Sequence, residues 1–304
     1  MENEAQNAGI WNQLSNSIAD TIEAVQGGVV AVDSGGRSST SGVVWRSGVV
    51  VTTHHGMRRD EGIKVLRQGE PTSASLVGLD PSTDLAVLRI SSDLAPVKSV
   101  TDTNLRAGQI VLAVGRSRLG DISAACGIVA RTGKGWRTWR GGQIDSLIRP
   151  DVQLYVGQAG SALVNEKREV LGINSPALAR QAVITIPART IDRVVDAVLE
   201  RGHVPRPFLG IAMQPVPVPE PVRSLFPKDA EQALLITHVE PKAPAAVAGV
   251  MVGDLILSIG GEPIQGVREI LHRLAGLRIG DTISLVVIRG GANVDLTVGI
   301  ADRG

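Results

Sequence analysis

Residues 80–90 read Asp80-Pro-Ser-Thr-Asp84-Leu-Ala-Val-Leu-Arg-Ile90, an acidic turn that runs directly into an apolar stretch. Upstream, residues 50–55 read Val-Val-Thr-Thr-His-His, an apolar run that ends in two histidines. Downstream, residues 157–165 read Gly-Gln-Ala-Gly-Ser-Ala-Leu-Val-Asn, a glycine-flanked loop that leads into another apolar run. Between residue 29 and about residue 186 such runs are short, and Gly, Ser, Asp or Pro separate them. This texture predicts many short strands in a barrel or sandwich and does not fit alternating strand–helix units.

The overall composition suits a mainly β protein of two domains. The chain has 304 residues, 43% of them hydrophobic and 20% charged, with 35 glycines and only four Trp, two Phe and one Tyr. Val, Ile and Leu must therefore fill the core, and glycines supply the turns. The net charge of +1 lacks the basic excess typical of nucleic-acid-binding proteins, so we expect no nucleic-acid partner.

The cysteine and histidine content argues against metal chemistry. A single cysteine, Cys126, excludes an internal disulfide framework and a Cys-rich zinc site, and we expect it to be a small buried residue. His203, His238 and His272 are far apart in sequence and lack the spacing of metal ligands. We therefore expect no metal and no cofactor.

Two stretches with helical periodicity bracket the β-rich part. Leu14, Ile18, Ile22 and Val25 recur at helical spacing, which predicts an N-terminal helix over residues 1–26. A second helix is expected near residues 190–201, with Thr190 as its cap and Gly202 as its terminator. Residues 27–202 then form the first domain, residues 203–206 a stiff linker, and residues 207–304 a small α+β domain.

The N-terminus begins Met-Glu-Asn-Glu-Ala-Gln and lacks the cationic start and apolar run of a secretory signal. No apolar stretch is long enough to span a bilayer, so we expect a soluble chain with no membrane contact. If Met1 is the natural start, the sequence predicts a cytoplasmic protein. If a leader has been removed, the protein is extracytoplasmic.

The three segments quoted above contain the residue types that acyl transfer needs. A histidine at a strand end can act as a base, an aspartate before a strand can orient it, and a glycine-rich loop can point backbone amides at an oxyanion. Each feature alone has a bland explanation: a structural histidine, a turn aspartate and a plain turn. Their order in the chain, however, is that of chymotrypsin-type proteases.

Several segments give a specific resemblance to the HtrA/Deg family of trypsin-like serine proteases with one C-terminal PDZ domain. Residues 51–55, Val-Thr-Thr-His-His, are similar to the Thr-Asn-Asn-His segment of the family, and residues 83–90 are similar to its Thr-Asp-Leu-Ala-Val-Leu-Lys-Ile segment. Residues 171–174 and 184–187 resemble the strands that close its specificity pocket. The similarity runs from about residue 20 to residue 302. It implies a chymotrypsin-like double β-barrel followed by a PDZ domain.

The resemblance implies a role for each matching position. His55 is the general base and Asp84 its orienting carboxylate, whereas His54, one residue earlier on the expected strand, faces away. The backbone amides of Gly157 and Ala159 would form the oxyanion hole. The walls of the S1 pocket would be Ile184, Thr185 and Ile186, and such an apolar pocket favours small or medium aliphatic side chains.

The departure from the family lies at the nucleophile. The family pattern is Gly-Asn-Ser-Gly-Gly-Pro-Leu, and residues 157–163 read Gly-Gln-Ala-Gly-Ser-Ala-Leu, so Ala159 occupies the position of the serine. Alanine has no oxygen to attack a carbonyl, and the chain is predicted to be catalytically inactive. Ser161 lies two positions past the turn, where a strand begins, and is a poor replacement.

Two explanations of Ala159 are open. It is a deliberate Ser→Ala change in an endopeptidase of protein quality control that cleaves unfolded proteins, which the intact His55 and Asp84 favour. Alternatively, the chain is a natural pseudoprotease or adaptor that binds peptides without cutting them.

The C-terminal segment resembles a bacterial PDZ domain. Phe208, Leu209, Gly210 and Ile211 match the loop that binds a peptide carboxylate, and residues 253–260 match the Gly-Asp-x-Ile signature. A helix from Val267, with Leu271 on the same face, would form the other wall of the groove, although these side chains also suit the domain core. The resemblance implies unfolded or C-terminal hydrophobic peptides as partners and a homo-oligomer, a trimer, as the assembly.

Residues 131–140, Arg-Thr-Gly-Lys-Gly-Trp-Arg-Thr-Trp-Arg, combine basic and aromatic side chains. We expect an exposed hairpin here. The family places at this point a mobile loop that relays activator binding to the oxyanion hole, which is the second interpretation. Nucleic-acid binding ranks last.

Overall fold

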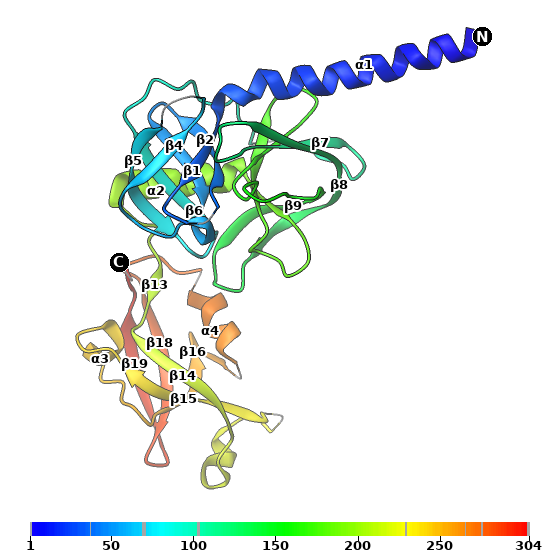
Figure 1. Cartoon of the computed structure of the whole chain (residues 1–304). Coiled ribbons are helices and arrows are strands. Elements are labelled where there is room, and N and C mark those ends of the chain that lie inside the picture. Colours follow the sequence, from blue (N-terminus) through cyan, green and yellow to red (C-terminus); the bar gives the residue numbers. More distant parts are fainter. Residues whose placement is uncertain are drawn as a thin grey trace. The chain divides into compact units, whose positions relative to one another are not determined.

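The structure is a computed structural model that describes residues 2–36, 38–68, 71–101, 104–228, 230–264, 266–274 and 276–302, with side chains from residue 9 onward except that of Arg268. The chain forms two compact units, Met1–Val204 and Pro205–Gly304. Figure 1 shows the elements of each. No helix in the described ranges is long and apolar enough to cross a membrane.

The first unit contains two closed six-stranded barrels (Figure 1). The strands of the first are β1 (Val29–Asp33), β2 (Thr40–Arg46), β3 (Val49–Thr53), β4 (Ile63–Leu66), β5 (Thr72–Asp80) and β6 (Leu85–Ile90), in the order β1-β2-β3-β6-β5-β4. The strands of the second are β7 (Ile110–Arg116), β8 (Ile122–Arg137), β9 (Gln143–Asp151), β10 (Ala162–Val164), β11 (Val170–Ser175) and β12 (Ile184–Pro187), in the order β10-β11-β12-β9-β8-β7. The predicted double barrel is therefore confirmed.

Each barrel is filled by β-branched and leucine side chains, as the scarcity of aromatic residues predicts. Val30, Val50 and Leu88 belong to a buried cluster that fills the first barrel, and Val129 and Leu163 to one that fills the second. A third and larger cluster lies between the two barrels and under α2 (Ala188–Arg201). This packing holds the two barrels together, and with them the segments that each contributes to the site.

Two helices flank the barrels. In α1 (Glu2–Val25), Ile18, Ile22 and Val25 pack on the core, while Trp11 is 70% exposed. The one-turn helix η1 (Gln26–Gly28) then connects α1 to β1. Helix α2 ends at Gly202, which adopts the left-handed conformation, φ 79°, expected of a terminator.

The second unit is a five-stranded antiparallel sheet with short helices and two small strand pairings. Its elements are β13 (Pro207–Phe208), β14 (Ile211–Pro217), η3 (Glu220–Leu225), β15 (Gln232–Val239), α3 (Pro244–Val247), β16 (Leu255–Ile259), β17 (Glu262–Pro263), α4 (Val267–Leu274), β18 (Thr282–Arg289), β19 (Ala292–Gly299) and β20 (Ala301–Asp302). The main sheet has the order β14-β15-β16-β18-β19, so that β14 is an edge strand. The buried Asp254 carboxylate forms an ion pair, 2.7 Å, with the half-buried Arg289, which ties the start of β16 to the end of β18.

The structure corrects two local expectations. Thr190 is not the cap of α2, which begins after Pro187; its hydroxyl instead donates to the Asp145 carboxylate, 2.6 Å, from inside the helix. Cys126 is exposed because β8 turns this side chain out of the barrel. Strand alternation places neighbouring residues on opposite faces, and a one-residue shift of the pattern exchanges the two.

Candidate functional site

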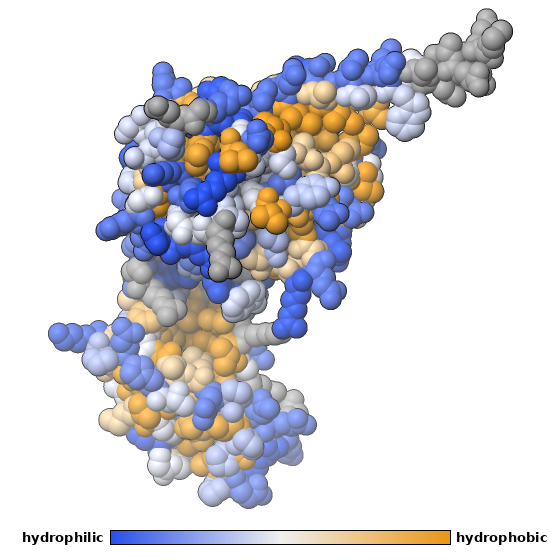
Figure 2. All heavy atoms as spheres, in the orientation of Figure 1, coloured by the Kyte–Doolittle hydropathy of each residue, from blue (hydrophilic) through white to orange (hydrophobic). Residues whose placement is uncertain are grey.

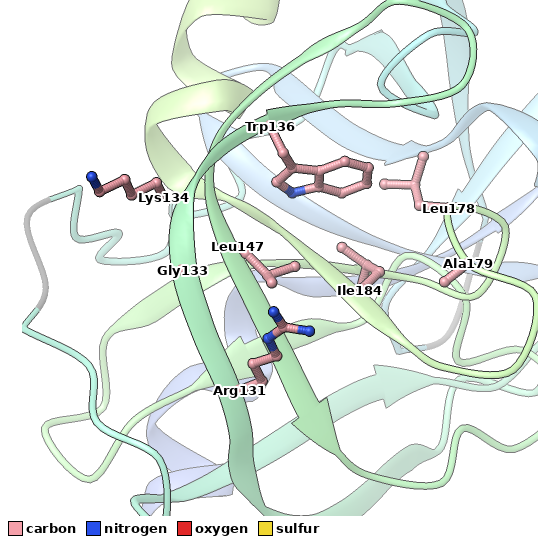
Figure 3. A pocket seen from close by; sticks show the side chains of 8 residues that line it. All are labelled: Arg131, Gly133, Lys134, Trp136, Leu147, Leu178, Ala179 and Ile184. Carbon is pink, nitrogen blue, oxygen red and sulfur yellow. The ribbon is translucent and has the colours of Figure 1, made fainter.

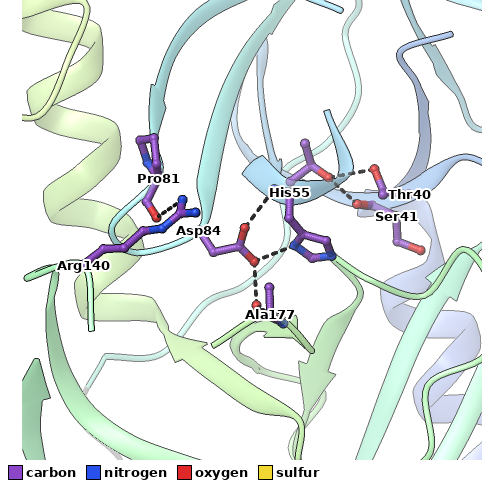
Figure 4. Close-up of polar contacts among 9 residues, drawn as sticks. Thr40, Ser41, His55, Pro81, Asp84, Arg140 and Ala177 are labelled. Atoms are coloured by element: carbon purple, nitrogen blue, oxygen red, sulfur yellow. Dashed lines mark hydrogen bonds and ion pairs between the residues drawn. The ribbon is translucent and has the colours of Figure 1, made fainter. Parts of the chain in front are cut away.

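His55 and Asp84 lie at the edge of the first barrel and are hydrogen-bonded to each other (Figure 4). Strand β3 ends at Thr53 and the one-turn helix η2 (His54–Gly56) follows. The Nδ1 atom of His55 lies 2.8 Å from a carboxylate oxygen of Asp84, and the backbone amide of His55 donates to the other oxygen, 2.9 Å. The histidine side chain remains one-third exposed, whereas the aspartate side chain is 5% exposed. The buried Asp84 carboxylate therefore holds a His55 imidazole that is partly exposed to solvent.

Asp84 adopts a left-handed backbone conformation, φ 61°. This conformation is unfavourable for a non-glycine residue and costs about 1–2 kcal/mol. It is held by hydrogen bonds from the His54 amide to the Asp84 carbonyl, 3.0 Å, and from the His55 amide to the carboxylate. The strain is stored where the carboxylate must meet the histidine, as is common at functional sites.

Ser175, the last residue of β11, completes this group and was missed by the sequence analysis. Its hydroxyl donates to the Asp84 carboxylate, 2.5 Å, and the residue is fully buried. Ser175 follows directly on the Leu171–Asn174 segment that carried part of the resemblance, which is the signal that could have found it. We call His55, Asp84 and Ser175 the base side of the site.

His54 lies apart from this pair. Its Nδ1 atom is buried and has no hydrogen-bond partner among the described residues. Burial lowers the pKa of His54 from its ordinary value; the nearby Arg140 guanidinium acts in the same direction, and the carboxylates of Asp84 and Asp80 oppose it. Its surroundings therefore favour the neutral imidazole, and the side chain takes no part in the base side.

The turn that carries Asp84 is braced by the tip of the β8–β9 hairpin. The Thr138 hydroxyl donates to the carbonyl of Ser82, 2.7 Å, and accepts from the amide of Gly142, 3.0 Å. A Cβ at Gly142 would overlap the backbone of Ser82, so only glycine allows this approach. Within the turn, the buried Asp80 carboxylate accepts from the hydroxyl of Ser82, 2.6 Å, and from that of Thr83, 2.7 Å. Two parts of the protease unit thus fix one short segment.

Residues 157–162, which we call the nucleophile loop, lead into β10. Gly157 and Gly160 have positive φ values of 90° and 83°, and a Cβ at Gly160 would overlap the carbonyl oxygen of Ser41. The carbonyl of Ala159 accepts from the Ser41 amide, 2.8 Å. Among the described residues, the backbone amides of Gly157 and Ala159 have no acceptor. These two donors are therefore available to an oxyanion.

Ser161 is engaged elsewhere. It is fully buried and its hydroxyl accepts from the side-chain amide of Asn174, 3.1 Å. The Asn174 side-chain oxygen in turn accepts from the hydroxyl of Thr185, 2.7 Å. This buried chain of three polar side chains gives Ser161 a structural role and leaves the nucleophile loop without an available hydroxyl.

The residues predicted as S1 walls do not share one surface. Thr185 is fully buried on the Asn174 side of β12, and Ile186 is fully buried in the core between the barrels. Ile184 lines a hollow on the protease unit with Trp136, Leu147 and Leu178 (Figure 3). Sequence adjacency along a strand cannot place three consecutive side chains on one wall, because they alternate between faces.

The PDZ-type unit arranges its predicted groove residues around the edge strand β14. Leu209 is buried in the core of this unit and Gly210 has φ 82°; among the described residues, the amides of both lack an acceptor. Ile211 starts β14, and Phe208 pairs with β20. On α4, Leu274 is 8% exposed and belongs to the core, Val267 is partly buried, and Leu271 is 48% exposed. An unpaired strand edge and free loop amides are what an added peptide strand requires.

Comparison with known families agrees with both units. Residues 40–173 match the trypsin-like peptidase domain family, and residues 207–300 match the PDZ domain family. A serine protease Do-like HtrA of Lactobacillus helveticus is 31% identical over 315 residues, which cover 95% of this chain and 73% of the relative. A probable periplasmic serine endoprotease DegP-like of Pseudomonas putida is 33% identical over 266 residues, which cover 84% of this chain and 55% of the relative. The chain thus spans between about half and three quarters of such relatives.

Solved structures give the same result. The HtrA-type protease AlgW with a decapeptide has a TM-score of 0.69 at 27% identity, over 94% of this chain and 98% of that one. A Ser→Ala variant of AlgW with a decapeptide has a TM-score of 0.70, and a serine endoprotease from Yersinia pestis one of 0.68, both at 27% identity. The chain therefore belongs to the HtrA family of serine proteases, with a trypsin-like peptidase domain followed by a PDZ domain.

Proposed function

We propose that this chain binds extended peptides at the scaffold of an HtrA-type endopeptidase and, with alanine at position 159, does not hydrolyse them. The proposal rests on one observation: the site has its base and its oxyanion donors but has no nucleophile. The His55–Asp84 pair is in place and the amides of Gly157 and Ala159 are without acceptors, but residue 159 offers no oxygen. The single nearby serine of the loop, Ser161, is buried and bonded to Asn174.

The test is the substitution Ala159→Ser in the full chain. With the base and both oxyanion donors retained, the new hydroxyl is expected to raise cleavage of an unfolded protein substrate by at least about 10³-fold over the original chain. A matched control, Ala162→Ser, adds a buried hydroxyl at the first residue of β10, three positions further on, and is expected to give no cleavage. If the Ala159→Ser chain is folded but inactive, the endopeptidase scaffold is not competent and the proposal fails.

A preference for small aliphatic residues before the cleaved bond belongs to the same proposal. The neutral Asn174–Thr185 pair provides no carboxylate that could receive an arginine or lysine side chain. Mapping the cut sites made by the Ala159→Ser chain in an unfolded substrate tests this preference. Cleavage mainly after Lys or Arg would contradict it.

The PDZ-type unit supplies a second peptide site in this proposal. A peptide that ends in an apolar residue adds to the free edge of β14, its carboxylate meets the amides of Leu209 and Gly210, and Leu271 contacts its last side chain. Leu271→Asp is expected to weaken binding of such a C-terminal peptide by at least about tenfold. The control, Val247→Asp on the exposed side of α3, is expected to leave binding unchanged.

Assembly and location follow the family in this proposal. Ile110 on β7 and Ile128 on β8 are directly opposite each other and 46% and 42% exposed, and Figure 2 shows apolar side chains gathered on the protease unit beside the base of α1. Such a surface supports a homo-oligomer, with a trimer as the expected form. Relatives named periplasmic support an extracytoplasmic location. Light scattering of the full chain and of Ile110→Glu tests the oligomer.

One observation favours a natural non-cleaving protein over an engineered inactive form of an endopeptidase. The loop departs from the family pattern at residues 158, 161 and 162 as well as at 159, and Ser161 is built into the buried hydrogen bonds to Asn174. A single deliberate Ser→Ala change accounts for residue 159 alone. Sequencing codons 158–162 in the source gene separates the two explanations, because an engineered form requires a serine codon at 159.

A further inference from the structure

A hollow of about 420 Å³ lies on the protease unit between the β8–β9 hairpin and the segment that joins β11 to β12 (Figure 3). Its walls include Arg131 and Trp136 from β8, Leu147 from β9, Leu178 from the joining segment and Ile184 from β12. The volume falls within the range of about 300–1,000 Å³ that is usual for small-molecule sites.

This hollow is separate from the nucleophile loop. Along β12, Thr185 faces Asn174 and Ser161, beneath the loop that carries Ala159. Ile184 precedes Thr185 in the strand and so projects to the opposite face, into the hollow. A ligand there would contact neither His55 nor Asp84, and its binding does not depend on the proposed peptide chemistry.

The inner surface is apolar. Figure 3 shows the side chains of Leu147, Leu178 and Ile184 and one face of the Trp136 ring directed into the same space. These residues are buried or half-buried, so they present carbon surface without being fully covered. An alkyl chain placed against them would leave water and bind favourably.

The rim is positively charged and lacks a compensating acid. Arg131 on β8 and Arg149 on β9 are directly opposite each other. Two like charges in this position repel each other and destabilise the pairing of the strands. Neither has an ion pair with a described residue, and no acidic side chain lines the hollow. Asp145, which lies on the same hairpin, is engaged by Arg193 and Thr190. An anion beside Arg131 would remove the repulsion.

The hollow also contains an unused donor. The indole nitrogen of Trp136 is buried and has no acceptor among the described residues. In Figure 3 this nitrogen lies on the ring edge nearer Leu147 and Arg131. A buried N–H without a partner is unfavourable, and an oxygen atom of a ligand could accept from it.

We propose that this hollow binds a small amphiphilic carboxylate. Its alkyl chain packs on Leu147, Leu178 and Ile184, and its carboxylate pairs with the Arg131 guanidinium within reach of the Trp136 N–H. In Figure 3 the guanidinium of Arg131 is directed toward Leu147 and Ile184, which places the positive charge at the edge of the apolar surface. A neutral alcohol of the same chain length has the apolar part of this interaction and lacks the ionic part.

Calorimetric titration of the full-length chain with octanoate, below its micelle concentration, tests the proposal, with 1-octanol as the neutral probe. Octanoate is expected to bind at one site per chain and more tightly than octanol. Arg131→Gln is expected to weaken octanoate binding at least about tenfold and to leave octanol binding unchanged. Leu147→Gln is expected to weaken both. The control is Arg137→Gln, because Arg137, from the same strand, bonds to the Gly141 carbonyl and does not line the hollow.

A spectroscopic readout locates the ligand. In an amide and indole NMR spectrum, the Trp136 N–H signal is expected to shift with octanoate and to stay in place with acetate, which lacks the alkyl chain. Trp136→Phe assigns the signal. The proposal is overturned if octanoate fails to bind the folded chain. It is also overturned if Arg131→Gln and Leu147→Gln bind octanoate as tightly as the parent chain does. Should Leu147→Gln not fold, Arg131→Gln and the Trp136 signal still decide the question.

Discussion

The base side and the nucleophile loop of this site differ in what holds them. On the base side, the buried Asp84 carboxylate receives bonds from His55 and Ser175, and its strained backbone is held by further bonds. In the nucleophile loop, residue 159 is held through its carbonyl, which accepts from the Ser41 amide, and its methyl side chain forms no hydrogen bond. A change at Asp84 therefore disturbs the structure, whereas a change at residue 159 does not.

This difference affects what can be inferred from the presence of His55 and Asp84. An aspartate with several buried donors cannot be replaced without leaving those donors unsatisfied, which costs about 1–3 kcal/mol for each. Retention of His55 and Asp84 thus has a structural reason that is independent of catalysis. Their presence does not by itself indicate that Ala159 was introduced deliberately. Substitutions in both the base side and the nucleophile loop are needed to separate structural from catalytic roles.

The largest effect is expected from Asp84→Asn combined with Ala159→Ser. The amide would favour the wrong histidine tautomer, and kcat for an unfolded substrate should fall by about 10⁴-fold relative to Ala159→Ser alone. Asp60→Asn, at an exposed position of the same barrel, serves as the control and should have no effect. Equal activity with and without Asp84→Asn would mean that the base side is only structural.

A smaller effect is expected from Thr138→Val in the Ala159→Ser background. This change removes the bond to the Ser82 carbonyl and loosens the turn that holds Asp84. We expect kcat to fall by about fivefold with KM unchanged, since a positioning hydrogen bond worth about 1 kcal/mol is lost.

Thr138 is a positioning residue, so its test includes a readout other than rate. The downfield Nδ1–H resonance of His55, which reports its bond to Asp84, should broaden or move in Thr138→Val. Thr138→Ser keeps the hydroxyl and should restore both the rate and the resonance. An unchanged resonance with a lowered rate would refute the role in positioning Asp84.

Some features of the fold and of the site could be predicted from the sequence, and others could not. Short β-branched runs predicted a mainly β first domain, and the resemblance to the HtrA/Deg family implied the double barrel, the PDZ-type unit and the His55–Asp84 pair, because the motifs that carry it are written in consecutive residues. Ser175 and Thr138 could not be found in this way. Ser175 bonds to Asp84, and Thr138 to Ser82 in the turn before it, from the second barrel, so both contacts depend on how the barrels pack.

The S1 residues illustrate a second limit. Ile184, Thr185 and Ile186 were predicted as one wall from a matching segment, and the structure distributes them among the hollow, the Asn174 side and the core. The prediction of Cys126 as buried met the same difficulty. A motif identifies a strand, but the face that each side chain takes depends on the register of the closed barrel.

A modest effect on stability, and none on catalysis, is expected from Ser161→Ala. The substitution leaves the Asn174 side-chain amide without its acceptor inside the protein, which should lower the free energy of unfolding by about 1 kcal/mol. Cleavage by the Ala159→Ser chain should be unaffected. Ser91→Ala, at an exposed position, is the matched control and should change neither quantity. If Ser161→Ala abolishes cleavage in a folded chain, Ser161 takes part in catalysis and its role is not only structural.

The smallest effect concerns His54, which lies beside the base side without belonging to it. Burial lowers its pKa below the ordinary value of 6.5, with Arg140 acting in the same direction against Asp84 and Asp80. Below pH 6.5 the unfolded chain therefore takes up a proton more readily than the folded chain. Stability contributed by His54 is present above that pH and is lost as the pH falls toward the pKa of the folded state.

His54→Gln should remove this part of the pH dependence. Urea unfolding of the protease unit within the full chain, at about pH 8 and about pH 5, should show a smaller loss on acidification for His54→Gln than for the parent. His203→Gln, at a half-buried position of the same unit, should behave like the parent. An equal loss in all three chains would show that the acid sensitivity arises from the carboxylates and that His54 is not held neutral by its surroundings. If only His54→Gln loses less stability on acidification, the fold disfavours the charged form of His54. The neighbouring His55 differs, because the fold pairs it with a carboxylate.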